Sequence, residues 1–293
     1  AATELRFDRA ENSLSFANKG LGRSIVDGAR MTRIDCRQIS GDALADAAEI
    51  RRAYDCVVKE GFFVLEHIVA KDKIAALNLE FRARYGNYFE DRELADTLKI
   101  GNKRYMTSVG LQGGFADCEI YANPYVGAVA RLALGSDAVL ESFGAVVSLA
   151  GAKRQHIHRD GPLLFDASIS PILPAHALTV AMPLIDMNEH HGTTALWPGS
   201  HRWKERNEEV SPIIPEIPTG SCVLWDFRLF HGGTENRSDQ HRPMIYSTYS
   251  RRWYQDPANF SKKALPRLTY DEAFLRSVPE DRRSFFYHVM KAD

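Results

Sequence analysis

The sequence predicts a mainly β protein with flanking helices, in which a sandwich or jelly roll of short strands follows a helical front. From about residue 140 onward, short β-rich runs are separated by turn sequences such as Pro198-Gly199 and Gly232-Gly233. Before residue 135, apolar residues recur mostly at helical spacing. The irregular connections argue against alternating β-α-β units. A length of 293 residues allows one elaborated domain or two small ones, and we expect a single domain over 36–293.

The helical front is expected over 40–135, behind an N-terminal extension over 1–35 that lacks sustained periodicity. Ser40 can cap the first helix and Gly61 can end it. Residues 87–122 give no clear pattern. The predicted elements of the front are a helix over 40–60, a strand over 62–65, a helix over 72–85 and a helix between Asn123-Pro124 and Gly135.

The β-rich core, read as a sandwich or jelly roll, is expected over about 140–255. The turn sequences delimit several short strands. A C-terminal helical segment is expected over 256–293. The predicted strands of the core cover 145–149, 176–184, 193–197, 221–227 and 244–249.

The composition narrows the possible partners. With 37 Lys and Arg against 38 Asp and Glu, the net charge is −1, and no basic cluster marks a nucleic-acid or membrane surface. No apolar run reaches the ~18–20 residues of a membrane span. The four scattered cysteines and a start without an apolar signal core predict a cytoplasmic protein with free thiols. The oligomeric state cannot be deduced from these features.

The most informative chemical feature is the run Gln-His-Ile-His-Arg-Asp at 155–160. On a strand, His158 and Asp160 would project to the same side about 7 Å apart, whereas His156 would point to the opposite face and serve a structural role. One strand cannot surround a metal, so a third ligand must come from elsewhere. His231, just before two glycines, is the best candidate. Two histidines and one carboxylate with open positions form the facial triad of non-haem Fe(II) oxygenases.

Arg242 is a second anchor, because a turn after His231 would bring the next strand back and place this arginine deep in the same cavity. A guanidinium is a planar, two-pronged donor for a carboxylate. A metal triad combined with a carboxylate clamp is what a 2-oxoglutarate site requires.

These motifs together resemble the phytanoyl-CoA dioxygenase family of Fe(II)/2-oxoglutarate oxygenases. The resemblance covers about residues 45–255. The residues that carry it are Gln155-x-x-His158-x-Asp160, Pro198-Gly199-Ser200-His201, His231-Gly232-Gly233 through Asn236 to Arg242, and Tyr249-Ser250-Arg251-Arg252-Trp253-Tyr254.

The resemblance implies a double-stranded β-helix core with the N-terminal helices buttressing one of its sheets, and Fe(II) held by His158, Asp160 and His231. It also implies that Arg242 binds the distal carboxylate of 2-oxoglutarate, with O₂ as the oxidant. By the same match, Gln155 and Thr194 would lie near the co-substrate. Residues expected in the vicinity of substrate or co-substrate, without a motif to fix them, are Lys103, Arg104, Tyr105 and Arg159.

The expected reaction is oxidation of an unactivated C–H bond of a small molecule, with release of succinate and CO₂. Hydroxylation is the leading interpretation, and desaturation or cyclisation remains open. A specialised metabolite or amino acid derivative is favoured as substrate. The alternative is a zinc- or manganese-dependent hydrolase or isomerase on a similar β scaffold, since zinc accepts the same ligands. That alternative would give Arg242 no function.

Overall fold

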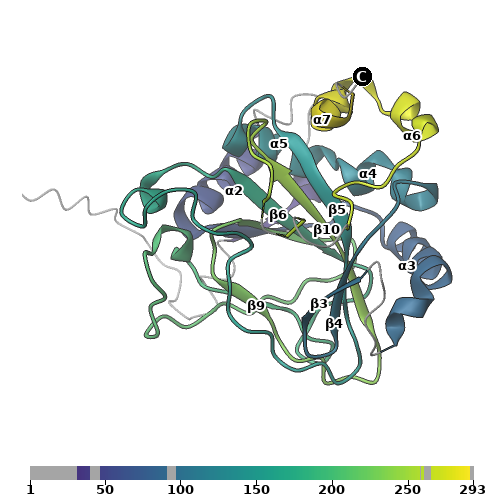
Figure 1. Ribbon diagram of the computed structural model, residues 1–293, viewed down its shortest axis with the longest axis horizontal. Coiled ribbons are helices and arrows are strands. Elements are labelled where there is room, and N and C mark those ends of the chain that lie inside the picture. The colour runs from purple at the N-terminus through teal and green to yellow at the C-terminus, as the bar shows by residue number, and fades with distance from the viewer. Residues whose placement is uncertain (1–31, 40–46, 91–96, 258, 261–264, 291–293) are drawn as a thin grey trace, which may run out of the picture.

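The computed structural model describes residues 32–39, 47–90, 97–257, 259–260 and 265–290 (Figure 1). One large mixed sheet has the strand order β1-β2-β8-β6-β10-β5-β4-β3, and a small sheet pairs β7 with β9. The strands of the large sheet are β1 (Arg33–Asp35), β2 (Phe62–Glu66), β3 (Thr97–Gly101), β4 (Arg104–Ser108), β5 (Val139–Ser148), β6 (Ala177–Pro183), β8 (Cys222–Asp226) and β10 (Arg242–Ser250). Those of the small sheet are β7 (Thr194–Leu196) and β9 (His231–Gly233).

Helices cover one side of the large sheet. In Figure 1, strands β5, β6 and β10 lie between helices α2, α4 and α5 on one side and β9 on the other. The small sheet and its neighbouring loops therefore lie on the side of the large sheet that the helices do not cover. This arrangement confirms the predicted jelly-roll architecture. The helices are α2 (Ala48–Glu60), α3 (Lys71–Tyr85), α4 (Cys118–Tyr121), α5 (Pro124–Leu134), α6 (Glu272–Ser277) and α7 (Tyr287–Met290).

Residues along the long strands alternate between a helix-covered face and a cavity face, because successive side chains of a strand point to opposite sides. On β10, Ile245 and Tyr249 pack in the core under the helices, whereas Met244 and Tyr246 line a cavity on the opposite face. The cavity face is the one on which the candidate site lies.

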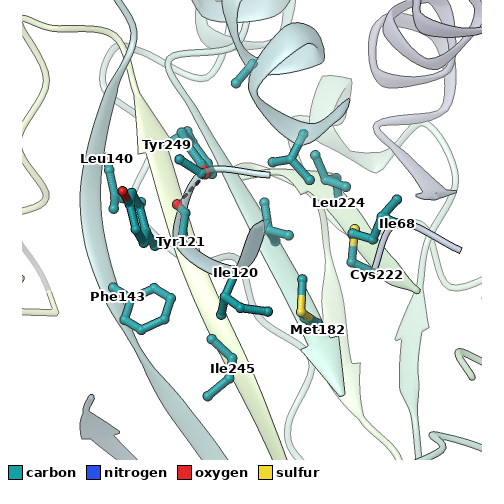
Figure 2. Close-up of a cluster of buried hydrophobic side chains, with 14 of the residues drawn as sticks. Ile68, Ile120, Tyr121, Leu140, Phe143, Met182, Cys222, Leu224, Ile245 and Tyr249 are labelled. Carbon is teal, nitrogen blue, oxygen red and sulfur yellow. Dashed lines mark hydrogen bonds between the residues drawn. The ribbon is translucent and has the colours of Figure 1, made fainter. Parts of the chain in front are cut away.

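The core under the helices is continuous across several strands. Figure 2 shows Phe143, Ile245 and Met182 from neighbouring strands beside Ile120 and Tyr121 of α4. The hydroxyl of Tyr249 donates a hydrogen bond to the Tyr121 carbonyl oxygen at 2.8 Å. This contact ties the middle of the sheet to α4, so the sheet is a rigid base for the site on its other face.

The helix predictions are correct at the end of α2 and at the start of α5. Gly61 follows α2 with a φ of 83°, which a glycine adopts without strain, and Asn123 caps α5 by accepting a hydrogen bond from the Tyr125 amide. The start expected at residue 40 is wrong, because α2 begins at Ala48; Ser40 itself lies outside the described residues. No side chain caps this helix, so the sequence holds no local signal for its start.

Three other expectations about elements need correction. Residues 33–35, assigned to an extension, form β1, which pairs in parallel with β2; residues 1–31 lie outside the described part. The helical front also contains β3 and β4, which extend the large sheet. In the C-terminal segment the described residues before 272 are not helical, and some of them line the cavity.

The expectations of free cysteines and of no membrane span can also be compared with the described residues. Cys36, Cys56, Cys118 and Cys222 are free. None of the helices in the described ranges combines the length and apolar character needed to cross a membrane.

Candidate metal centre and co-substrate pocket

A short antiparallel bridge brings His158 and His231 together. The amide of each residue donates to the carbonyl oxygen of the other at 2.9 Å. Such a directly opposed pair places both side chains on one face, and the two imidazole rings lie 4.4 Å apart. The expected strand through His158 and Asp160 is wrong, since only His158 forms a bridge and the chain around it is irregular.

Both imidazoles are oriented by backbone carbonyl oxygens. Nδ1 of His158 lies 2.9 Å from the carbonyl oxygen of His156, and Nδ1 of His231 lies 3.0 Å from that of Leu229. A carbonyl oxygen only accepts, so each Nδ1 carries the proton. Each Nε2 then has a free lone pair, which is the arrangement found in metal-binding histidines.

The carboxylate of Asp160 is held by two donors from the large sheet. Oδ2 accepts a hydrogen bond from the Thr179 hydroxyl at 2.6 Å and another from the Trp225 indole Nε1 at 2.7 Å. The other oxygen, Oδ1, lies 3.3 Å from His231 Nε2. One oxygen is therefore fixed by the protein, and the other points to the space between the histidines.

The protonation states of His158 and Asp160 suit metal binding. Burial lowers the pKa of His158 to about 4, and His231 adds to this effect. Burial alone would raise the pKa of Asp160, but His231 and the hydrogen bonds to the carboxylate bring it down to about 2. For His231, the lowering by burial is exceeded by the attraction of Asp160, so its pKa is raised. At neutral pH His158 is neutral and Asp160 is ionised.

The three side chains fit a divalent metal ion. One ligand atom from each of His158, Asp160 and His231 lies within 4.8 Å of the others. Two imidazole nitrogens and one carboxylate oxygen on one side of an ion leave its remaining positions open, as in the facial triad. The bonds to Thr179 and Trp225 supply the outer contacts that such sites use to orient their ligands.

Two arginines lie together at the inner end of a cavity of about 370 Å³ that also contains the triad. In the strand register, Arg242 of β10 and Arg104 of β4 both pair with Ser148 of the intervening β5. Both side chains are almost fully buried, each with 1% of its surface exposed. The two charges are therefore neighbours through sheet pairing, although they are far apart in sequence.

Arg242 is a buried cation without an anionic partner. Its Nε forms no hydrogen bond, its Nη1 lies 3.9 Å from the Met244 sulfur, and no carboxylate among the described residues pairs with it. Burial, together with the charge of Arg104, lowers its pKa to about 9. Burial also lowers the pKa of Arg104 to about 10. A pair of desolvated guanidinium groups facing a cavity creates a strong local demand for an anion.

Arg104 is fixed by the segment that carries His231. Its Nη2 donates to the carbonyl oxygen of Thr234 and to that of Lys153, the latter at 3.3 Å. A Cβ atom at Gly233 would lie 2.7 Å from Arg104 Nη1, so only glycine leaves room for the guanidinium. The absence of a side chain at Gly233, two residues after His231, thus leaves the space that the Arg104 guanidinium occupies.

Gln155 and Thr194, expected near the co-substrate, both line the same cavity. Gln155 also joins two segments, since its Nε2 donates to the Ile100 carbonyl oxygen at 3.1 Å and its Oε1 accepts from the Gly233 amide at 3.2 Å. Thr194 is buried on β7, opposite Gly233.

The four residues predicted less specifically separate into two groups. Arg104 and Arg159 line the cavity, whereas Tyr105 points to the helix-covered core and Lys103 does not line the cavity. The guanidinium of Arg159 is occupied by the Phe230 ring, 4.0 Å away, and by two backbone carbonyl oxygens. Lys103 donates to the Ala150 carbonyl oxygen.

The expectation for His156 is wrong. Its ring lies 5.0 Å from the His158 ring and lines the same cavity, because the chain between the two residues does not follow the strand alternation. The sequence interpretation also missed Thr179, Trp225 and Asn259, which contact Asp160. Thr179 and Trp225 lie in predicted strands, over 176–184 and 221–227, whereas Asn259 lies outside every predicted strand.

Comparisons with known proteins agree with this geometry. A family model described as phytanoyl-CoA dioxygenase (PhyH) matches residues 57–244. Dioxygenase trt7 of Aspergillus terreus is 26% identical over 205 residues, which cover 66% of this chain and 70% of that protein. Dioxygenase FUM3 of Gibberella moniliformis is 24% identical over 205 residues, which cover 65% and 68%.

A solved structure shows the same fold. The epimerase SnoN, in complex with Fe3+, alpha ketoglutarate and nogalamycin RO, aligns with a TM-score of 0.55 at 15% sequence identity. The alignment covers 80% of this chain and 97% of SnoN. At this identity the likeness concerns the fold.

Proposed function

The chain belongs to the phytanoyl-CoA dioxygenase family and is an Fe(II)/2-oxoglutarate dioxygenase, and from this premise we propose that it hydroxylates an unactivated C–H bond of a small molecule. The reaction would convert substrate, O₂ and 2-oxoglutarate into hydroxylated product, succinate and CO₂. One oxygen atom enters the product and the other enters succinate. The observation that carries the proposal is that one cavity contains both the triad and the buried Arg242, with which no carboxylate of the described residues pairs.

In this proposal His158, Asp160 and His231 hold Fe(II). The bound iron supplies the redox chemistry that activates O₂ and oxidises the substrate. The protein residues supply the geometry, since the backbone carbonyl oxygens orient the imidazoles and two hydrogen bonds fix the carboxylate.

The two arginines bind the end of 2-oxoglutarate that lies away from the metal. Arg242 receives the distal carboxylate, and Arg104 adds a second positive charge beside it. Gln155 and Thr194 form the adjoining wall. Because the anion neutralises desolvated guanidinium groups, co-substrate binding offsets the cost of burying them. A hydrolase or isomerase with zinc or manganese would leave this pair without a role, so we do not favour that alternative.

The substrate occupies the part of the cavity that the co-substrate leaves open, and the cavity lining includes several apolar side chains. The hydroxyl of Tyr246 is buried there, and within the described chain it has no hydrogen-bond partner. Burial, together with the Asp256 carboxylate, raises its pKa, so it remains protonated. The apolar side chains that contribute to the lining are Met106, Val146, Phe227, Met244 and Phe260.

These contacts favour a neutral, mostly apolar substrate with at least one hydrogen-bonding oxygen. Besides Arg104 and Arg242, Arg159 is the remaining Arg or Lys among the described residues that line the cavity, and its guanidinium is already held by Phe230 and backbone carbonyl oxygens. The carboxylate of Asp256 also disfavours an anionic group nearby. SnoN, which shares the fold, is solved with a small molecule, and this supports a specialised metabolite.

Succinate release tests the proposal. The protein purified without oxygen and loaded with Fe(II) should release succinate from 2-oxoglutarate only when O₂ is present. A panel of neutral polycyclic metabolites, amino acid derivatives and acyl-CoAs should contain compounds that accelerate this release. If the Zn(II)-loaded protein instead converted a compound of the panel under nitrogen, without forming succinate, the protein would be a hydrolase.

A further inference from the structure

The segment after β10 reaches back to the candidate iron ligand. Residues 254–257 and 259–260 follow the last strand of the large sheet and lie beyond residues 57–244, which match the family model. Asp256, Asn259 and Phe260 nevertheless line the cavity that contains the triad. This segment therefore contributes to the site through contacts that the family match does not cover.

Asn259 joins the segment to Asp160 through both hydrogens of its side-chain amide. Nδ2 donates to the backbone carbonyl oxygen of Asp160 at 2.9 Å and to Oδ2 of Asp256 at 2.7 Å. The backbone amide of Asn259 donates to the other carboxylate oxygen of Asp256 at 3.2 Å. With both amide hydrogens used, the side chain can adopt only one orientation.

The other end of this connection is anchored in the large sheet. Glu141 of β5 is 3% exposed, and its carboxylate accepts hydrogen bonds from the Asp256 amide at 2.9 Å and from Arg267 Nε at 2.7 Å. Arg267 also donates to the Asp256 carbonyl oxygen and lies over the Phe260 ring at 5.1 Å. The buried Glu141 carboxylate on β5 thus holds Asp256, and Asp256 holds Asn259. The side-chain amide of Asn259 is therefore fixed relative to the large sheet.

Asn259 completes the set of contacts that determines where Asp160 lies. The amide of Asp160 donates to the Phe227 carbonyl oxygen at 3.1 Å, and the carboxylate is held by Thr179 and Trp225. Those three contacts come from the jelly roll. The carbonyl side of the peptide, where the chain leaves the site, is held by Asn259.

We propose that Asn259 is a positioning residue for the metal, which holds the Asp160 peptide so that the carboxylate oxygen Oδ1 faces the two imidazoles. This inference rests on the proposed assignment of Asp160 as an iron ligand. Phe260 and Asp256 also line the cavity. The hydrogen bonds of Asn259 therefore connect this part of the cavity wall to Asp160. A substrate that packs against Phe260 and Asp256 would therefore influence the position of Asp160 through Asn259.

The test measures Fe(II) binding without any substrate. The full chain, without oxygen and with excess 2-oxoglutarate, is titrated with Fe(II), and the visible charge-transfer band gives the dissociation constant. For Asn259→Ala we expect this constant to rise about tenfold or more, since loss of an outer contact costs about 10–100-fold in metal affinity. Asn259→Ser keeps one donor and should give an intermediate rise.

The spectrum of bound Co(II) separates positioning from folding. In Asn259→Ala the cobalt d–d bands should shift, because the carboxylate ligand has moved, while the metal-free protein should unfold at the wild-type temperature. Trp253→Ala is the matched control, since Trp253 immediately precedes this segment but is 65% exposed and lines a different pocket. Its metal affinity should not change.

Two results would overturn the inference. One is an Asn259→Ala protein with wild-type Fe(II) affinity and an unchanged cobalt spectrum. The other is a loss of affinity that only parallels a lower unfolding temperature of the metal-free protein. A wild-type protein that forms no band at all would instead reject the proposed function, so the two failures are distinguishable.

Discussion

Replacement of Arg242 by methionine is expected to weaken 2-oxoglutarate binding strongly and to stabilise the metal-free protein. The side chain supplies charged hydrogen bonds worth roughly 1.5–3 kcal/mol each, so loss of two should weaken binding by about 100-fold or more. In the absence of the anion, Arg242 is a desolvated charge beside Arg104. Methionine removes that unfavourable burial, and the unfolding temperature should rise by about 2 °C or more.

Isothermal titration with 2-oxoglutarate and thermal unfolding of the metal-free protein give the two quantities. Arg237→Met is the matched control, because Arg237 is an exposed arginine of the loop before β10 that pairs only with Glu189 and Glu235 among the described residues. It should change neither quantity. An Arg242→Met protein that binds 2-oxoglutarate as wild type does would rule out the clamp.

Asp160→Asn is the second substitution with a large expected effect. Asparagine can keep an oxygen beside the Thr179 and Trp225 donors, so the fold should remain intact. The atom that faces the histidines becomes an uncharged amide nitrogen, which is a poor ligand for a divalent ion. We expect Fe(II) affinity to fall about 100-fold or more, beyond the range for an outer contact, and dioxygen-dependent succinate release to be lost.

Metal content after dialysis and the Fe(II) titration measure this loss. Asp166→Asn is the control, because the Asp166 carboxylate caps a surface turn by accepting from the Ser168 amide, a role that asparagine can fill. Circular dichroism should be the same for both variants. Unchanged iron binding in Asp160→Asn would mean that this carboxylate is not a ligand.

The chemical part of the site was more predictable than its geometry. A metal triad and a carboxylate clamp could be proposed from the sequence, because few other sites combine two histidines, an aspartate and an arginine. These residue types occur in the run at 155–160 and at His231 and Arg242. The strand expected through His158 does not exist, however. The two histidines meet through a single antiparallel bridge, which no local pattern indicates.

Contacts that depend on sheet register could not be predicted. Arg104 and Tyr105 are adjacent in sequence, and strand alternation sends Arg104 to the cavity and Tyr105 to the core. Arg104 and Arg242 lie near each other because both residues pair with Ser148 of the intervening strand β5. Asn259 contacts Asp160 through an irregular segment, for which sequence periodicity gives no signal.

The fold shows the same division. The jelly-roll class and strong helix ends such as Gly61 follow from composition and local chemistry. β1 could not be expected, because three residues are too short for a periodic pattern and are fixed by pairing with β2. The start of α2 at Ala48 lacks a capping side chain, so nothing in the local sequence specifies it.

An anaerobic titration with Fe(II) and 2-oxoglutarate tests most directly whether the triad and Arg242 form one site. Neither component alone should absorb in the visible range, and together they should give a weak, saturable charge-transfer band at one equivalent of each. The band should vanish in Asp160→Asn and require far more 2-oxoglutarate in Arg242→Met. A wild-type protein that gives no band at saturating concentrations of both would contradict the assignment of this cavity as the iron and 2-oxoglutarate site.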